Sequence, residues 1–364
     1  MVRVRSRRAV GAFGAATLLV GLAGLIGLLG VGQAIAAPNP MTTMGDAAGS
    51  TGSGAGGSAA ASTAAAGGIT LKAGISSVAS GKVAVLEFLP ERASVAVGDP
   101  VTWTFPSTEP HSVTFVPAGA PQPRFQTDPS LAAPTPTTGP VTTSTFVNSG
   151  LLPTPTSEGV PTFTLTFGAP GTYSYFCILH PNMVGTLDVG ATTEPQRAVT
   201  ARGYDEGIRY VREGRAAQRA LLAEAPVRTR NADGTTTWTV EMGTSTEHTE
   251  VYSYAPSPTT VRTGDTVTFV NDSAAPHTSS FGGKLVPLDP EAPTVKAPVP
   301  GPGPLRLVPD TYLNTGWLPP GKVPGAAPLA ARSFSFVAGE PGRYEYVCVL
   351  HVPSGMAGSI RVRD

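Results

Sequence analysis

Two stretches of this sequence decide its fold: Pro170-Gly-Thr-Tyr-Ser-Tyr-Phe-Cys-Ile-Leu-His180 and Pro341-Gly-Arg-Tyr-Glu-Tyr-Val-Cys-Val-Leu-His351. In both, a Pro-Gly turn precedes alternating residues with the period of a half-buried β-strand. Both strands end in Cys-x-x-His, and a methionine follows at Met183 or Met356. An internal repeat of this kind indicates the architecture more firmly than local propensities do.

The repeat continues toward the N-terminus of both stretches. Gly98-Asp-Pro-Val-Thr-Trp103 corresponds to Gly264-Asp-Thr-Val-Thr-Phe269, so equivalent positions in this region are 166 residues apart. A Pro-His pair follows in each copy, with His111 and His277 both thirteen residues beyond the glycine. Another 37 residues lead to Asn148-Ser-Gly in the first copy and to Asn314-Thr-Gly in the second. The chain therefore contains two copies of one structural unit.

The composition predicts an all-β fold for both copies. The chain has 43 glycines and 37 prolines, and only 14% of its residues are charged, which favours short strands and many turns. Residues 101–105, 162–167 and 332–336 alternate apolar and polar side chains, as half-buried strands do. We expect two Greek-key β-sandwich domains.

The order of segments predicts five regions. Residues 196–224 are rich in charge and place Tyr204, Ile208 and Val211 on one helical face, which is typical either of a connector between domains or of a packed surface helix. Residues 42–68 are nearly all Gly, Ala, Ser and Thr, the composition of a flexible linker. The predicted regions are an export segment (1–36), a linker (37–68), a first domain (69–192), a helical connector (193–232) and a second domain (233–364).

The N-terminus indicates export across the cytoplasmic membrane. Four arginines precede an apolar run from Ala9 to Ala36, which is either a signal peptide cut after Ala34-Ile-Ala36 or an uncleaved anchor that would tether the chain to the membrane. Both alternatives place the remaining chain outside the cytoplasm. Without those arginines the chain has 21 basic and 25 acidic residues, so we expect no nucleic-acid partner.

The repeated histidines, cysteines and methionines form two candidate copper-binding sets. A soft thiolate, two imidazoles and a weak axial thioether suit both Cu(I) and Cu(II), and four protein ligands leave no open position for a substrate. We therefore expect two type 1 copper sites and an electron carrier rather than an enzyme. The sets are His111, Cys177, His180 and Met183 in the first copy, and His277, Cys348, His351 and Met356 in the second.

Both halves resemble the cupredoxins, the plastocyanin and azurin family, over nearly all of residues 80–190 and 240–364. The spacing from His180 to Met183 is similar to the short ligand loop of amicyanin-like proteins. The longer spacing from His351 to Met356 is similar to plastocyanin and pseudoazurin.

The resemblance also implies roles for other residues. The residue after the first histidine helps to pin the ligand loop in this family; Ser112 matches that pattern and Thr278 departs mildly from it. The resemblance further implies that His180 and His351 lie under apolar surface patches, through which electrons pass to a redox partner protein. The sequence does not identify that partner.

Other interpretations of the same residues remain open at this stage. Cys177 and Cys348 are the only two cysteines of an exported chain, so they could form a disulfide. The second site could also have lost its metal. The fifth histidine, His248, corresponds to Lys82 in the first copy and has no repeated partner, so we interpret it as a surface residue.

Other classes of copper protein compete with the carrier. Multicopper oxidases and copper nitrite reductases are also tandem cupredoxins, but a type 2 or trinuclear centre needs several more histidines than the single one that remains. A copper-binding or copper-delivery protein without redox duty is the third class. The six methionines form no cluster, which argues against copper delivery.

Overall fold

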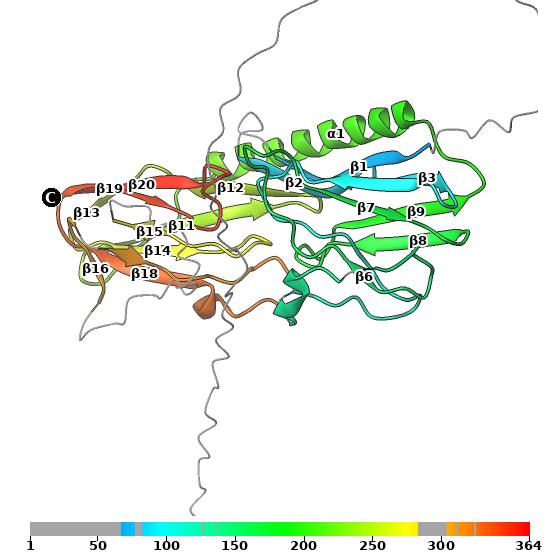
Figure 1. Cartoon of the computed structure of the whole chain (residues 1–364). Helices are drawn as coiled ribbons and strands as arrows, with labels where there is room; N and C mark the ends of the chain where they lie inside the picture. Colours follow the sequence, from blue (N-terminus) through cyan, green and yellow to red (C-terminus); the bar gives the residue numbers. More distant parts are fainter. Residues whose placement is uncertain are drawn as a thin grey trace, which may run out of the picture.

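The computed structural model describes residues 67–76, 82–125, 127–135, 137–282, 304–310, 312–323 and 325–364. The predicted export segment, 1–36, and all but the last two residues of the predicted linker, 37–68, lie outside these ranges. The described chain is mostly β-strand, with one α-helix, so the all-β prediction is confirmed in this coarse form (Figure 1).

Nine strands belong to the first copy of the repeat. They are β1 (Ile69–Ser76), β2 (Val83–Leu89), β3 (Arg92–Ala96), β4 (Pro100–Thr104), β5 (Thr114–Phe115), β6 (Val147–Asn148), β7 (Thr162–Thr166), β8 (Gly171–Phe176) and β9 (Val184–Gly190). A short 3₁₀ helix, η2, covers Pro129–Ala132. Helix α1 follows at Gln196–Ala223.

Eleven strands follow the helix. They are β10 (Arg228–Arg230), β11 (Thr236–Ser245), β12 (Thr249–Ala255), β13 (Thr259–Arg262), β14 (Thr266–Val270), β15 (Ser280–Phe281), β16 (Arg306–Leu307), β17 (Leu313–Asn314), β18 (Ser333–Ala338), β19 (Gly342–Val347) and β20 (Ala357–Arg363). A second 3₁₀ helix, η3, covers Leu329–Ala331. The repeated tyrosine runs form β8 and β19, and the other predicted strands lie within two residues of β4, β7 and β18.

The strands form two layers in each copy. One layer is a separate five-stranded sheet, β3-β9-β8-β5-β6 in the first copy and β13-β20-β19-β15-β17 in the second. The other layer belongs to a ten-stranded sheet that runs through both copies. Apolar residues of both layers share one core cluster in each copy, including Trp103 and Tyr175 in the first and Phe269 and Tyr346 in the second. Because alternate side chains of a strand point to the same face, the apolar faces of the two layers pack against each other.

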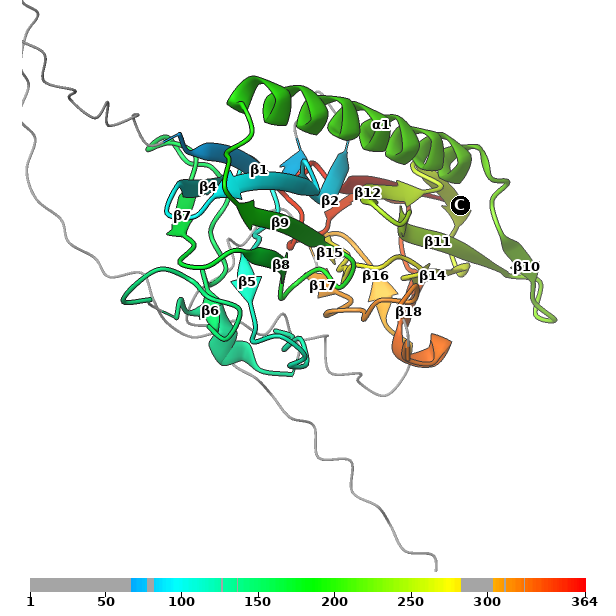
Figure 2. The same ribbon diagram turned by 90° about the vertical axis from the view of Figure 1, so that its right-hand side faces the viewer.

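The large sheet is continuous between the two copies because two equivalent strands, one from each copy, pair with each other (Figure 2). Strands β2 and β12 are antiparallel, with Val83 opposite Val251, Ala84 opposite Glu250 and Val85 opposite Thr249. Ala84 and Glu250 are equivalent positions of the repeat, 166 residues apart. The pairing is therefore isologous, as at a twofold axis of a homodimer, and the copies are related by a local twofold axis through this residue pair.

Helix α1 lies across the junction between the copies and packs against β1, β2, β11 and β12 (Figure 2). Glycines on its inner face allow this approach: a Cβ on Gly214 would lie 2.4 Å from Val83 Cγ1, and one on Gly203 would lie 3.0 Å from backbone atoms of Leu89 and Pro90. The segment predicted as either a connector or a packed helix is thus a helix packed on both copies. Among the described residues, no helix is long and apolar enough to cross a bilayer.

Under this helix, His248 is more enclosed than a surface residue. Its Nδ1 lies 3.0 Å from Oε1 of Glu87, and its ring packs against that of Tyr210 with centroids 4.2 Å apart and the two planes tilted by 38°. Glu87 is only 4% exposed. Burial, followed by the charges of Glu91 and other nearby glutamates, raises the pKa of Glu87 to about 9.

This shift predicts how stability depends on pH. Because the pKa of Glu87 is higher in the folded chain than in the unfolded one, the folded state loses stability as pH rises from about 4.5 toward 9. In Glu87→Gln we expect a shallower loss over this range, and at least about 1 kcal/mol more stability at pH 8 than the unsubstituted chain. Denaturant unfolding at a series of pH values measures this. The control is Glu345→Gln, because the side chain of Glu345 is 74% exposed. This substitution should leave the slope of stability against pH unchanged. Equal slopes in all three proteins would contradict the prediction.

Candidate metal centres

In each copy, the cysteine predicted to bind metal directly follows the central strand of the five-stranded sheet. Cys177 comes after β8, and the loop that it begins returns at Met183, whose carbonyl oxygen accepts a hydrogen bond from Cys177 N (3.0 Å). The same bond links Cys348 N to Met356 O (3.0 Å) in the second copy. Both methionines are buried, at 0% and 1% exposure. The strand and its return bond thus hold the cysteine and the methionine of each set together.

The second ligand loop is two residues longer and contains an extra turn. Ser354 N donates to His351 O (3.2 Å), and Gly355 N donates to Val352 O (2.9 Å). Gly355 has a φ of 71°, which favours glycine at this turn. The two ligand loops, for which the sequence predicts different lengths, therefore also differ in backbone structure.

The remaining histidine of each set comes from a separate segment, which a repeated motif fixes in place. Leu152 N donates to His111 O, and Leu318 N donates to His277 O, both at 2.9 Å. The Asn-Ser-Gly and Asn-Thr-Gly motifs support these segments: Ser149 Oγ accepts from Val113 N and Thr315 Oγ1 from Ser279 N, both at 2.9 Å. These contacts explain why the motifs recur at a constant distance from the histidines.

Two histidines and a cysteine converge in each copy. In the first cluster, Nδ1 of His111 and Nδ1 of His180 are 3.0 Å apart, and Cys177 Sγ is 3.5 Å from His180 Nδ1. In each copy the three ligand atoms lie within 4.8 Å of one another. Both cysteines are free thiols, so the disulfide alternative is wrong.

The second cluster has nearly the same geometry. His277 Nδ1 and His351 Nδ1 are 3.1 Å apart, and Cys348 Sγ lies 3.3 Å from His351 Nδ1 and 3.9 Å from His277 Nδ1. All three residues are buried. The structure therefore keeps a complete second set of these donors.

Ser112 and Thr278 play the same role. The backbone N–H of each faces the cysteine sulfur, at 3.4 Å from Ser112 N to Cys177 Sγ and 3.3 Å from Thr278 N to Cys348 Sγ. Their hydroxyls accept from the next loop, Ser112 from Ile178 N (2.9 Å) and Thr278 from Val349 N (3.0 Å). The methyl group of threonine does not disturb this bond, so the mild departure at Thr278 is without consequence for the pinning of the loop.

These donors fit a soft or borderline cation. The two Nδ1 atoms of the first cluster face each other at 3.0 Å, where they can share the N–H of one tautomer or direct their lone pairs at one cation. Burial holds the pKa of His111 well below its usual value and lowers that of His180 to about 3, so both rings are neutral, the form in which imidazole binds a metal. Two imidazoles and a thiol, with a methionine on the same loop, form the donor set that copper prefers.

The two clusters differ in their charges. Burial raises the pKa of the Cys177 thiol. Burial also opposes ionisation of Cys348, but His351 and His277 outweigh it and hold that pKa well below its usual value. Burial opposes protonation of His277, yet hydrogen bonds to Cys348 and Glu250 raise its pKa to about 9.

Glu250 contributes to the raised pKa of His277, after the larger effect of Cys348. It is fully buried, and its Oε1 lies 3.4 Å from His277 Nε2. Its equivalent in the first copy is Ala84, which carries no charge. The second cluster thus contains a buried carboxylate that the first does not have.

Two glycines that no sequence motif marked also shape the centres. Gly74 lies at a bulge in β1, and Gly243 at a bulge in β11. A Cβ on Gly74 would lie 2.2 Å from His111 Nε2, and one on Gly243 would lie 2.8 Å from His277 Nε2. A glycine within a predicted strand can mark a bulge, but only the structure indicates which ring it faces.

The C-terminal histidines of both clusters face the boundary between the copies. A cavity of about 740 Å³ lies there, and His180, His351 and apolar side chains such as Trp317 line it. His351 is only 4% exposed, and Tyr252 stacks on its ring with centroids 4.4 Å apart. Val352, Pro353 and Ala357, beside His351 in the sequence, are exposed as the resemblance implied, but Glu109 and Tyr252 cover the His351 ring itself.

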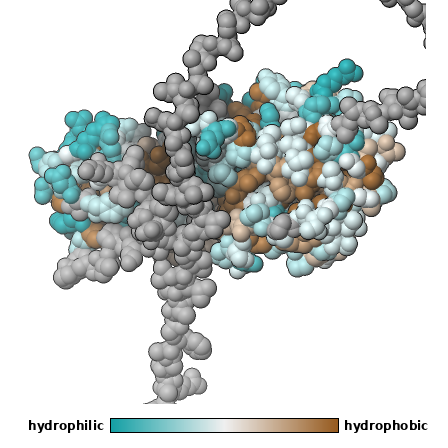
Figure 3. Space-filling model, in the orientation of Figure 1, coloured by the Kyte–Doolittle hydropathy of each residue, from teal (hydrophilic) through white to brown (hydrophobic). Residues whose placement is uncertain are grey.

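Figure 3 shows one face of the molecule, on which hydrophobic residues lie at the surface of the first copy. Val184, which directly follows Met183, is 38% exposed. His180 is partly exposed, in contrast to His351. The two centres therefore differ in how they reach the surface.

Comparisons with known proteins return solved structures only. No protein-family model and no curated protein matches the chain. The structure is similar to a methionine-to-alanine mutant of amicyanin in its Cu(I) form, with 24% identity over 36% of this chain and 89% of the other, at a TM-score of 0.22. The Cu(I) form of another methionine-to-alanine mutant of amicyanin is 25% identical over the same shares, at a TM-score of 0.23.

Gly74 provides a test of the first centre. We expect Gly74→Ala to displace His111 and to weaken copper binding at the first centre by about 10- to 100-fold, while the second centre keeps its affinity. Copper titration of the variant measures both. The control is Gly98→Ala, because Gly98 also has a positive φ, of 87°, but no atom lies within 4 Å of an added Cβ. Equal losses in the two variants would show that backbone strain, not the His111 contact, is the cause.

Proposed function

We propose that this chain is a copper-binding electron carrier with two type 1 sites, one in each of two cupredoxin-like β-sandwich domains. The observation that carries the proposal is the repeated convergence of two imidazole Nδ1 atoms and a free thiol within 4.8 Å. The proposed ligands are His111, Cys177, His180 and Met183, and His277, Cys348, His351 and Met356.

The residues around each cluster support a carrier. Copper held by two imidazoles, a thiolate and a weak thioether exchanges a single electron. The return bond from Cys177 N to Met183 O and the contact from Ser112 N to Cys177 Sγ hold the donors in place before any metal binds. Such preorganisation keeps the donor positions similar in both oxidation states. The other donors are buried, so only the partly exposed His180 ring borders solvent.

The supply of histidines supports a carrier rather than an enzyme. The chain has five histidines, and four of them belong to the two clusters. His248 is the fifth, and it pairs with Glu87. A type 2 or trinuclear copper centre needs several further imidazoles, so we propose that the chain has no catalytic copper centre.

We further propose where the carrier works and what it meets. The arginines and the apolar run of residues 1–36 favour a location outside the cytoplasmic membrane, with or without a membrane tether. We propose a redox partner protein that docks near His180, because this ring is partly exposed and Val184 beside its loop is 38% exposed. We propose no nucleic-acid partner.

Copper titration tests the proposal. We expect the exported part of the chain to bind two equivalents of copper and to show an intense visible band, and we expect Cys177→Ser and Cys348→Ser each to remove one equivalent and about half of the band. The control is His248→Gln, which should keep both equivalents. Copper bound without the visible band, or a band that survives both cysteine substitutions together, would contradict the proposal.

A further inference from the structure

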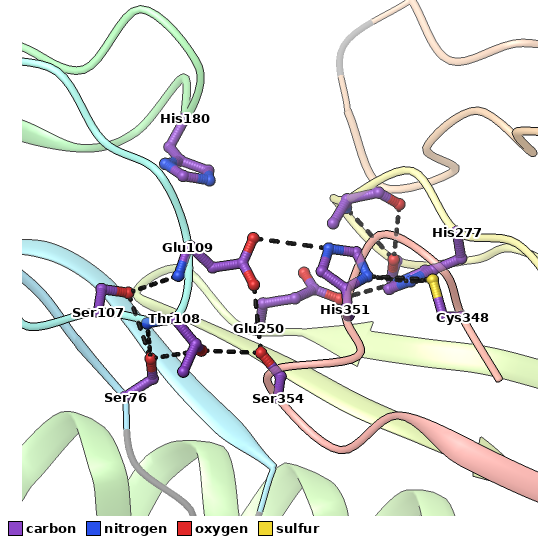
Figure 4. Close-up of polar contacts among 12 residues, drawn as sticks. Ser76, Ser107, Thr108, Glu109, His180, Glu250, His277, Cys348, His351 and Ser354 are labelled. Carbon is purple, nitrogen blue, oxygen red and sulfur yellow. Dashed lines mark hydrogen bonds and ion pairs between the residues drawn. The ribbon is translucent and has the colours of Figure 1, made fainter. Parts of the chain in front are cut away.

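Glu109 belongs to the first copy by sequence but contacts the second metal cluster. It lies two residues before His111, yet its Oε2 is 3.6 Å from Nε2 of His351 (Figure 4). The carboxyl group is almost completely enclosed, since the residue is 7% exposed. A buried carboxylate needs partners that offset its lost hydration, and here one of them is a predicted metal ligand of the other copy.

Hydrogen bonds fix Glu109 in this direction. Ser354, in the extra turn of the second ligand loop, donates to Glu109 Oε1 at 3.3 Å. Ser354 also bonds to the hydroxyl of Thr108 (2.8 Å), which in turn bonds to Ser76 (2.7 Å). Ser107 Oγ accepts from Glu109 N at 3.1 Å. The network thus connects the segment before His111 to the second ligand loop.

The contact has no counterpart across the local twofold axis. The position equivalent to Glu109 is Ala275, 166 residues later, and alanine offers His180 no carboxylate. Both Ala275 and His180 line the boundary cavity. The local twofold axis would allow such a contact at both C-terminal histidines, but only one of the two equivalent positions has a carboxylate.

The chemistry of a ligating histidine gives this contact a role. His351 directs Nδ1 toward Cys348 Sγ, at 3.3 Å, which leaves Nε2 on the opposite side of the ring. A metal-binding histidine usually gives its second N–H to a carboxylate, which fixes the tautomer and the orientation of the ring. Tyr252 stacks on the same ring, so His351 is held from its face and from its Nε2 edge.

We propose that Glu109 is a positioning residue for His351, supplied by the first copy to the second metal centre. The second centre therefore depends on a side chain that the second copy does not contain. The first centre does not depend on it, although Glu109 is only two residues from His111 in the sequence. The inference rests on the proposed function insofar as the bound metal is copper.

The test separates the two centres. Cys348→Ser leaves only the first centre and Cys177→Ser only the second, and Glu109→Ala is added to each. We expect Glu109→Ala to weaken copper binding at the second centre by about 10- to 100-fold, as loss of a carboxylate behind a ligating histidine does, and to change the first centre less than about twofold. Competition with a chelator measures affinity, and the visible band identifies the centre. Glu109→Gln, which retains an acceptor oxygen, should lose less.

Glu247→Gln is the matched control, since Glu247 lines the same cavity but its side chain is 79% exposed and faces His248. We expect it to leave both centres unchanged. An equal loss at both centres in Glu109→Ala would overturn the inference, because Glu109 would then act on the local structure around His111. An unchanged second centre would overturn it as well.

A metal-free measurement distinguishes failure of this inference from failure of the proposed function. In the apo-protein, we expect Glu109→Gln to move the imidazole ¹⁵N resonances of His351 and to leave those of His180 in place. Unmoved His351 resonances would overturn the inference whether or not the protein binds copper. If the resonances move and neither single-centre variant binds copper, the proposed function fails while the positioning contact stands.

Discussion

The pairing of β2 with β12 is the interaction on which the rest of the structure depends. Two equivalent edge strands meet about a local twofold axis, with Ala84 opposite Glu250. The pairing satisfies backbone groups that two separate sheets would expose at their edges. Helix α1 then packs across the joined strands. Because the axis brings the same end of each copy to the boundary, both C-terminal histidines, His180 and His351, lie beside one cavity.

Side chains that differ between the copies break this symmetry. The axis relates Ala84 to Glu250 and Glu109 to Ala275, so each copy has one buried carboxylate where the other has alanine. Both carboxylates lie beside the second cluster, Glu250 at His277 and Glu109 at His351. One donor set is thus placed in two electrostatic environments, and Glu250 is one cause of the raised pKa of His277.

The sequence was sufficient for those features that depend on local pattern or on repetition. Alternating patterns predicted β4, β7, β8, β18 and β19 to within two residues, and the repeated spacing predicted which histidines and cysteines converge. The family resemblance marked Thr278 as a departure from the usual residue, but its hydroxyl makes the same bond as that of Ser112.

The relation between the copies could not be predicted, because nothing local in β2 or β12 specifies an edge partner. The roles of Glu109 and of the cover over His351 follow from that relation. Gly74 was missed for a similar reason, since its closeness to His111 depends on the parallel pairing of β1 with β4 and on a bulge. Sequence patterns indicate which residues face a core, but contacts between distant segments require the assembled structure.

The most direct test of two metal centres facing one boundary is anomalous diffraction at the copper edge from copper-loaded crystals. The account predicts two peaks, one beside Cys177 and one beside Cys348, related by the local twofold axis between β2 and β12. A third group of side chains close enough together to hold a metal ion, Glu87, Glu91 and His248, lies elsewhere at the junction. A peak at that group in place of either cysteine, or a single peak at full loading, would contradict the account.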